Sequence, residues 1–344
     1  MKNVEDVYPL SPMQQGMLFH TLYAPGSGAY VVHISCTMLG ALDIPAFKRA
    51  WQTVLQRHPI LRSAFLWERL DSPLQVVRQQ VELNWNEQDW RELSPATQKE
   101  RLDAYLWDEH LRGFDLSKAP LLHLTLFRLA DDTYQFIWHY SHLLLDGWSV
   151  HLVFHDLFTL YQAYAQGREL KLPRPRPYRD YIGWLQRQEL SKAEEFWRRT
   201  LKGFTTPTPL SFEGAGGGDA HAAGGATYDE IRTALSASAT ARLQSLARSH
   251  KLTLNTFVQG AWALLLSRYS GEDDLVFGVT VTGRPVSLSG VETMVGLLIN
   301  TLPMRVRVSE TEPLIPWLQK LQEHQFEVRQ YEYSALIDVQ GWSE

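Results

Sequence analysis

Apolar and polar residues alternate along residues 134–141, which is the pattern of a strand with one buried face. One face is aromatic and consists of Tyr134, Phe136, Trp138 and Tyr140, and the other consists of Gln135, Ile137, His139 and Ser141. After Gly147 the apolar residues recur at helical spacing, which predicts a helix with Ser149 as its candidate N-cap. Residues 141–149 are therefore predicted to form the turn between a strand and a helix, where an α/β fold presents reactive side chains.

The chain before this turn alternates between predicted strands and helices. Ser11 and Pro12 suit the N-cap and first position of a short helix, and Asp43 suits the N-cap of a second helix that ends near Pro59. The other predicted elements are a helix around 102–106 and strands at 31–37, 61–65 and 122–127. An Asp-Asp turn joins the last of these strands to the 134–141 strand, so the two are expected to pair. This mixture predicts a layered α/β sandwich.

A proline-spaced segment at residues 172–177 predicts a boundary near residue 170. Residues 213–226 are rich in glycine and alanine and predict a flexible surface loop. The remaining predicted elements are helices around 178–184, 196–197, 243–247, 257–266 and 314–321, and strands at 228–235, 275–281 and after 295. These features divide the chain into residues 1–170, connecting helices and a loop at 171–226, and residues 227–344.

Composition and charge argue against several classes of function. The 344 residues are enough for two cores, and 44% hydrophobic with 21% charged residues is ordinary for a soluble globular protein. The net charge is −5 with both signs interspersed, which argues against a nucleic-acid surface or a membrane-seeking patch. Cys36 is the only cysteine, and the sequence has no signal-peptide pattern and no apolar run of about 18 residues, so a cytoplasmic protein is expected.

The predicted turn carries the spacing His142-x-x-x-Asp146-Gly147. An imidazole titrates near neutral pH and can accept or share a proton with an attacking amine or alcohol. Asp146 could orient that histidine or pair with an arginine, and Gly147 would allow a close approach that a side chain would block. The alternative is a histidine whose ring is satisfied by backbone groups. Metal ligands do not cluster here, and no Gly-x-Ser-x-Gly elbow or phosphate loop is present.

Arg284 is the candidate ion-pair partner of Asp146. It follows a buried-looking strand and stands between Gly283 and Pro285, and a buried cation needs a partner. Arg57 and Arg62 compete for this role, and in the alternative all three arginines point to solvent.

The turn joins four other segments in an order that resembles the condensation domain of non-ribosomal peptide synthetases. The signature of that family, His-His-x-x-x-Asp-Gly, is matched from Ser141 to Gly147. The segments that resemble the other motifs are residues 11–20, 57–65, 178–184 and 294–301. Five motifs in order across nearly the whole chain make the resemblance specific.

The resemblance implies two lobes, 1–170 and 227–344, each similar to chloramphenicol acetyltransferase and arranged as a V. It implies an acyltransferase without a bound cofactor, in which the acceptor amine attacks a donor thioester and forms an amide. Both substrates would be held on the phosphopantetheine of donor and acceptor carrier domains, with an adenylation domain as a neighbour. The resemblance gives each site residue a role: His142 is catalytic, Ser141, Asp146, Gly147 and Arg284 are structural, and Trp148, Ser149 and Asn300 bind substrate.

Two departures from the family pattern are visible. Ser141 replaces the first histidine of the signature, and activity is expected to survive this change. The chain stops short of the usual domain end, so the second lobe is expected to be truncated.

Several motif residues resemble the subclass that takes a donor ending in a D-residue, with the L-donor subclass as the alternative. The donor is expected to come from a separate protein. Competing hypotheses are a degenerate domain that binds carriers or recruits an enzyme, and a related epimerization domain.

Overall fold

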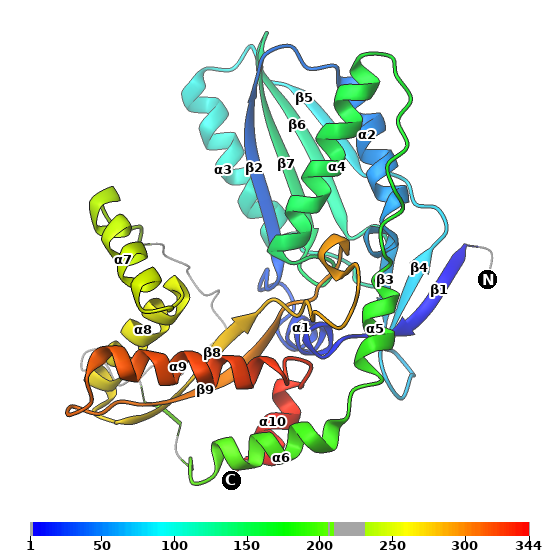
Figure 1. Ribbon diagram of the computed structural model, residues 1–344. Helices are drawn as coiled ribbons and strands as arrows, with labels where there is room; N and C mark the ends of the chain where they lie inside the picture. The colour runs from blue at the N-terminus through cyan, green and yellow to red at the C-terminus, as the bar shows by residue number, and fades with distance from the viewer. Residues whose placement is uncertain (1–2, 206, 210–230, 344) are drawn as a thin grey trace. The chain divides into compact units, whose positions relative to one another are not determined.

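The computed structural model describes residues 3–205, 207–209 and 231–343, and it is an α/β protein (Figure 1). Its contacts define two compact units, Met1–Gln188 with Arg284–Ile299, and Glu189–Gly283 with Asn300–Glu344. The predicted division at residues 170 and 226 stays a prediction. The predicted loop at 213–226 lies outside the described residues.

The first unit contains two sheets and the helices that cover them. Its elements are β1 (Val4–Pro9), α1 (Pro12–Tyr23), β2 (Val31–Leu39), α2 (Ile44–Arg57), η1 (Pro59–Arg62), β3 (Ser63–Leu66), β4 (Leu74–Arg78), β5 (Trp85–Asp89), α3 (Pro95–Arg112), β6 (Leu122–Ala130), β7 (Thr133–Ser141), α4 (Gly147–Ala165), α5 (Arg179–Leu185) and η2 (Val291–Thr293). The strand orders are β2-β7-β6-β5, with β5 parallel to β6, and β1-β4-β3. In the four-stranded sheet, α2 and α4 cover one face and α3 covers the other (Figure 1).

The local signals in the sequence explain where the first helices begin. Ser11 forms a reciprocal capping box with Gln14, and the Asp43 side chain accepts a hydrogen bond from the Ala46 amide. The predicted caps of both helices are therefore confirmed. The predicted strand at 61–65 begins later, because Pro59–Arg62 forms a 3-10 turn before β3.

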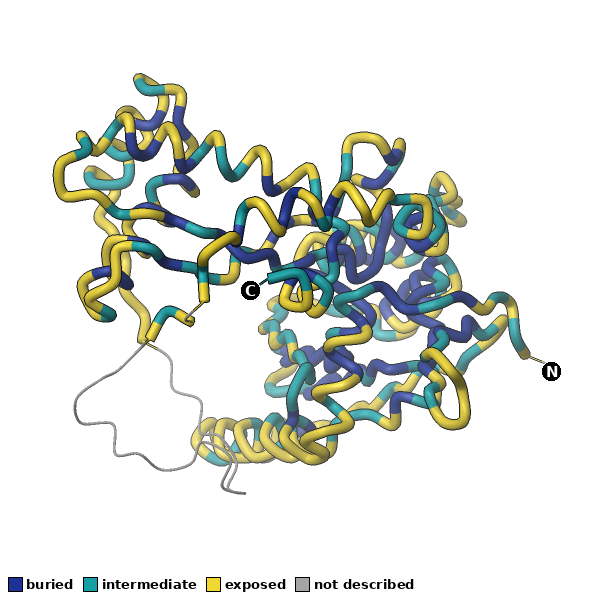
Figure 2. The backbone as a smooth tube through the Cα atoms, turned by 90° about the horizontal axis from the view of Figure 1, so that it is seen from below, coloured by how far each residue is buried: buried dark blue, intermediate teal, exposed yellow. Residues whose placement is uncertain are grey.

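The aromatic face of β7 forms the centre of the first core. Phe136 packs edge-on against Phe47 of α2 at 5.2 Å, and Trp138 packs against Trp51 at 5.0 Å between ring centroids. All four rings are at most 1% exposed, and each such buried side chain stabilises the fold by about 1.5–3 kcal/mol. Buried positions, drawn dark blue in Figure 2, are frequent in the part of the chain that contains this core. The predicted aromatic face and the pairing of β6 with β7 are confirmed.

The opposite face of the sheet carries a row of three histidines beneath α3. His139 of β7 lies directly between His33 of β2 and His123 of β6 in the strand register. From α3, the Glu109 carboxylate lies 3.2 Å from His123 Nδ1, and the Tyr105 ring lies 5.7 Å from the His139 ring. His139 is 1% exposed, and neither of its ring nitrogens has a hydrogen-bond partner among the described residues. Burial lowers the pKa of His139 to about 4.

The second unit is built around one antiparallel strand pair. Its elements are α6 (Leu190–Leu201), α7 (Ala237–Ser249), α8 (Leu254–Ser270), β8 (Asp274–Val281), β9 (Asn300–Arg307), α9 (Leu314–Arg329) and α10 (Leu336–Trp342). A core of its own joins Trp197 of α6, Leu302 of β9 and Leu318 of α9. The predicted strand at 228–235 is wrong in its described part, because residues 231–235 form no strand and Ile231 is 93% exposed.

The buried His139 predicts a pH-dependent stability. An unfolded histidine with a pKa of 6.5 binds a proton that folded His139, with a pKa of about 4, does not bind. The free energy of unfolding should therefore fall as the pH drops from 6.5 toward 4, by about 2–3 kcal/mol at pH 4.5 from this residue. Urea unfolding at pH 7 and pH 4.5 would measure the loss, which should be smaller by that amount in His139→Phe. His155→Phe, at an exposed position of α4, is the control, and equal losses in wild type and His139→Phe would refute the prediction.

Candidate active site

The turn between β7 and α4 is fixed by Asp146. This residue is the N-cap of α4, and its Oδ1 accepts a hydrogen bond from the Ser149 amide at 2.8 Å. The prediction that Ser149 caps the helix is wrong. Ser149 is the third residue of α4, and its backbone amide donates to the carboxylate of Asp146, the N-cap. The Ser149 side chain is then free to bond elsewhere.

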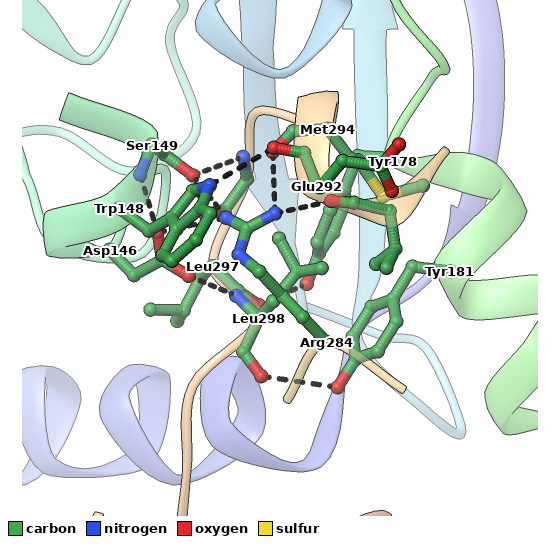
Figure 3. Close-up of polar contacts among 12 residues, drawn as sticks. Asp146, Trp148, Ser149, Tyr178, Tyr181, Arg284, Glu292, Met294, Leu297 and Leu298 are labelled. Carbon is green, nitrogen blue, oxygen red and sulfur yellow. Dashed lines mark hydrogen bonds and ion pairs between the residues drawn. The ribbon is translucent and has the colours of Figure 1, made fainter. Parts of the chain in front are cut away.

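The Asp146 carboxylate is enclosed by donors from a segment far along the chain (Figure 3). Arg284 Nη2 lies 3.3 Å from Oδ1, and the Leu298 amide donates to Oδ2 at 3.0 Å. The side chains of Asp146 and Arg284 are 0% and 6% exposed, so this ion pair is buried. The competing candidates pair with other carboxylates, Arg57 with Asp156 and Arg62 with Glu5.

Arg284 is the first residue of a segment that we call the 284–299 loop, and its side chain bonds to that loop. Its Nη1 donates to the carbonyl oxygens of Val291 at 2.6 Å and Met294 at 2.9 Å. Its Nη2 donates to Ser149 Oγ at 3.1 Å. Burial lowers the pKa of the guanidinium, and the neighbouring Asp146 opposes that shift. One cation therefore ties the loop to itself and to the start of α4.

Ser149 and two tyrosines complete the attachment of the 284–299 loop. Ser149 Oγ donates to the Gly296 carbonyl at 2.8 Å and accepts from the Gly296 amide at 3.0 Å. The Tyr178 and Tyr181 hydroxyls donate to the carbonyls of Leu297 and Leu298 at 2.7 and 3.3 Å (Figure 3). A Cβ at Gly296 would lie 2.1 Å from the Tyr178 ring, so a glycine is required there.

Trp148 holds the same loop from the outer side of the turn. Its Nε1 donates to the Glu292 carbonyl at 3.0 Å, and the Arg284 guanidinium lies 5.3 Å from the ring centroid (Figure 3). The ring is 50% exposed, which leaves part of its face open. The predicted roles of Trp148 and Ser149 in substrate binding stay predictions, although the polar groups of both side chains bond to the loop.

His142 lies at the end of β7 with its backbone amide bonded to the Tyr30 carbonyl at 2.8 Å. Its Nδ1 is buried and has no hydrogen-bond partner in the described part of the chain. The alternative in which backbone groups satisfy this imidazole is therefore not seen in the described part of the chain. A Cβ added to Gly147 would meet no described heavy atom within 4 Å, so there is open space beside the turn.

Asn300 is the predicted site residue that does not belong to the first unit. It begins β9 of the second unit and is 5% exposed. Its amide nitrogen donates to the carbonyls of Glu332 at 2.8 Å and Ser334 at 2.7 Å, and its oxygen accepts from the Thr301 amide. These bonds fix a turn in the second unit, and the predicted substrate contact of Asn300 stays a prediction.

A model of the condensation-domain family matches residues 4–343. The chain belongs to this family. It is 51% identical over 343 residues to one of the linear gramicidin synthase proteins of Brevibacillus parabrevis, covering 100% of this chain and 4% of that protein. It is 35% identical over 338 residues to surfactin synthase subunit 3 of Bacillus subtilis (strain 168), covering 98% of this chain and 26% of that protein. The condensation domain described here thus spans a small part of the curated relatives it matches.

Solved condensation domains have the same fold. The first condensation domain of the calcium-dependent antibiotic synthetase, in complex with a substrate analogue, matches with a TM-score of 0.79 at 18% identity, covering 97% of this chain and 76% of that one. The X-domain from teicoplanin biosynthesis matches with a TM-score of 0.78 at 24% identity, covering 97% and 73%. The predicted α/β fold class is confirmed, whereas the V-shaped arrangement and the truncated second lobe stay predictions.

Sequence reasoning missed most of the groups that hold the 284–299 loop in this condensation domain. Tyr178 and Tyr181 belong to a segment singled out as a motif, but nothing in their spacing indicated bonds to the loop. In the described residues, no group of three or more histidine, cysteine or acidic side chains could hold a metal ion. No described helix has the length and hydrophobicity that crossing a membrane requires.

Removing the cation from the buried pair should destabilise the domain strongly. In Arg284→Met the Asp146 carboxylate stays buried without its cation, so the free energy of unfolding should fall by about 3–5 kcal/mol. Urea unfolding would measure this loss. Arg49→Met removes a matched but exposed pair with Glu169 and should change stability little. A loss for Arg284→Met no larger than that of the control would contradict the structural role of the pair.

Trp148 offers a finer test of the loop attachment. Trp148→Phe keeps an aromatic ring beside Arg284 but removes the donor to the Glu292 carbonyl, a bond worth about 0.5–1.5 kcal/mol. Amide hydrogen exchange should speed up in residues 291–294 and stay unchanged in β6. Trp107→Phe, at a 57% exposed position of α3, is the control. Unchanged exchange in residues 291–294 would show that this bond does not hold the loop.

Proposed function

We propose that this condensation domain forms an amide bond between a donor acyl or peptidyl thioester and an acceptor aminoacyl thioester. The observation that carries the proposal is the signature turn itself. His142 directly follows β7, its buried Nδ1 has no hydrogen-bond partner among the described residues, and the turn after it is held by the buried Asp146–Arg284 pair. This arrangement occurs in a chain that matches the condensation-domain family along nearly its whole length.

The proposed reaction needs a group that positions the acceptor amine or takes its proton. The amine nitrogen attacks the donor carbonyl carbon, the carbon–sulfur bond breaks, and the pantetheine sulfur leaves and is finally protonated as the thiol. His142 would hold the attacking amine or accept its proton, since a neutral imidazole can do either near pH 7. Open space beside Gly147 would admit the reacting carbonyl. Asp146 and Arg284 act as positioning residues in this account.

The partners follow from the proposed chemistry. Donor and acceptor carrier domains would deliver both substrates on phosphopantetheine, and an adenylation domain would stand nearby. The length of the relatives, of which this chain covers 4–26%, supports a multidomain context. We also propose a cytoplasmic location, which the single cysteine supports. The motif residues named above support a donor that ends in a D-residue.

A non-catalytic platform is the second candidate. Ser141 in place of the first signature histidine favours it. One solved chain of the same fold, matched with a TM-score of 0.76, is described as a complex of the X-domain and OxyB from teicoplanin biosynthesis. In this alternative the chain would bind carriers or recruit another enzyme without joining their substrates.

Condensation can be tested by intact-protein mass spectrometry on a loaded acceptor carrier, with D- and L-ended donors supplied on a second carrier. The full-length protein should add the donor acyl mass to the acceptor, and His142→Ala should slow this transfer by about 10²–10⁴-fold. His155→Ala, on the exposed side of α4, is the matched control and should keep the wild-type rate. An unchanged rate in His142→Ala would exclude the proposed role, and bound carriers without transfer would favour the platform.

A further inference from the structure

A cavity of about 390 Å³ lies in the first unit beside Ser141. Its walls come from the end of α1, the loop at residues 24–29, the start of β2 and residues 111–116 at the end of α3. Ser141 itself is 3% exposed and contributes to the lining. Neither the fold nor the proposed reaction accounts for this cavity.

The cavity wall is bonded directly to the backbone of His142. Tyr30, the residue after the wall loop, accepts the His142 amide at 2.8 Å through its carbonyl. Val31, which lines the cavity, is the cross-strand neighbour of Ser141 in the register of β2 with β7. His142 is therefore the residue directly after Ser141 of the cavity lining, and short backbone bonds fix the positions of both residues.

The lining is suited to an apolar group. Its larger side chains are Leu22, Val31, Trp67, Leu111, Phe114 and Leu116. The two charged residues of the lining have neighbours of opposite charge, since Arg112 pairs with Glu109 and Asp115 pairs with Lys118. Leu22 and Leu111 are each 42% exposed, which leaves apolar surface at the edge of the cavity.

Two small residues, Gly28 and Ser141, form part of the cavity wall. A Cβ at Gly28 would lie 2.3 Å from His110 Nε2, so the loop packs closely on α3 only because residue 28 is glycine. Gly28 also has a φ of +69°, which side chains rarely adopt. Ser141 stands where the family signature has a histidine, and its small side chain leaves room that an imidazole would occupy.

We propose that this cavity receives the large apolar side chain, aromatic or branched aliphatic, of a carrier-bound aminoacyl group that reacts at His142. This inference rests on the proposed condensation and names the substrate class it selects. The volume lies at the lower end of the range for small-ligand pockets, so one large amino-acid side chain has room in it. Ser141 is then a specificity-determining residue, and its exchange for histidine would narrow the substrate range.

Two filling variants from different walls test the proposal, Ser141→His and Ala29→Leu. Condensation rates would be measured with glycine, alanine, leucine and phenylalanine, varied on the acceptor carrier in one series and on the donor carrier in the other. In one series the variants should lose at least 10-fold in kcat/KM for leucine and phenylalanine, with glycine changed by less than about 3-fold. The series that responds identifies which substrate enters the cavity. Ala41→Leu, at an exposed loop position, is the control of equal size.

Each other result has a distinct meaning. Equal losses for small and large substrates in both variants would show a general structural effect and overturn the specificity role. Full activity with phenylalanine in both variants would show that its side chain does not enter the cavity. A wild-type protein that binds both carriers but transfers none of the four residues, glycine included, would refute the proposed condensation, and this inference with it.

Discussion

The site depends on the buried carboxylate of Asp146. A carboxylate removed from water costs several kcal/mol unless donors surround it, and here the Ser149 amide, the Leu298 amide and Arg284 do so. Two of these donors lie 138 and 152 residues away in the sequence. The start of α4 and the 284–299 loop must therefore assemble together. His142, four residues before Asp146, takes its place from an arrangement that no local segment could fix alone.

Periodicity predicted the elements whose burial is one-sided and long enough to leave a pattern. β7 and α4 were found this way, and the caps at Ser11 and Asp43 were found because capping is a contact within four residues. The short strand β5 was not found, because most of its residues are exposed and carry no alternation. α10 has seven residues, too few for a helical repeat to stand out.

Only part of the site could be predicted from the sequence. The turn and the candidate partner Arg284 could be named because a buried cation beside Gly283 and Pro285 needs a counterion. The hydrogen bonds from the Tyr178 and Tyr181 hydroxyls could not be predicted, because their acceptors are backbone carbonyls. Every residue has such a carbonyl, so the sequence does not indicate which one is bonded. The cap was misplaced because both Asp146 and Ser149 are good N-cap residues, and only the hydrogen bond between them shows which one begins the helix.

The two faces of β7 explain why a serine is tolerable in the signature. On the aromatic face every ring contributes packing, but the face toward α3 already holds His139 between His33 and His123. Residues two apart on a strand lie on the same face about 7 Å apart, so a histidine at position 141 would be the nearest same-strand neighbour of His139. An imidazole there would add buried polar nitrogens beside His139, whose own ring nitrogens have no hydrogen-bond partner among the described residues. With Ser141 the layer avoids a fourth imidazole, and the cavity that Ser141 lines stays open.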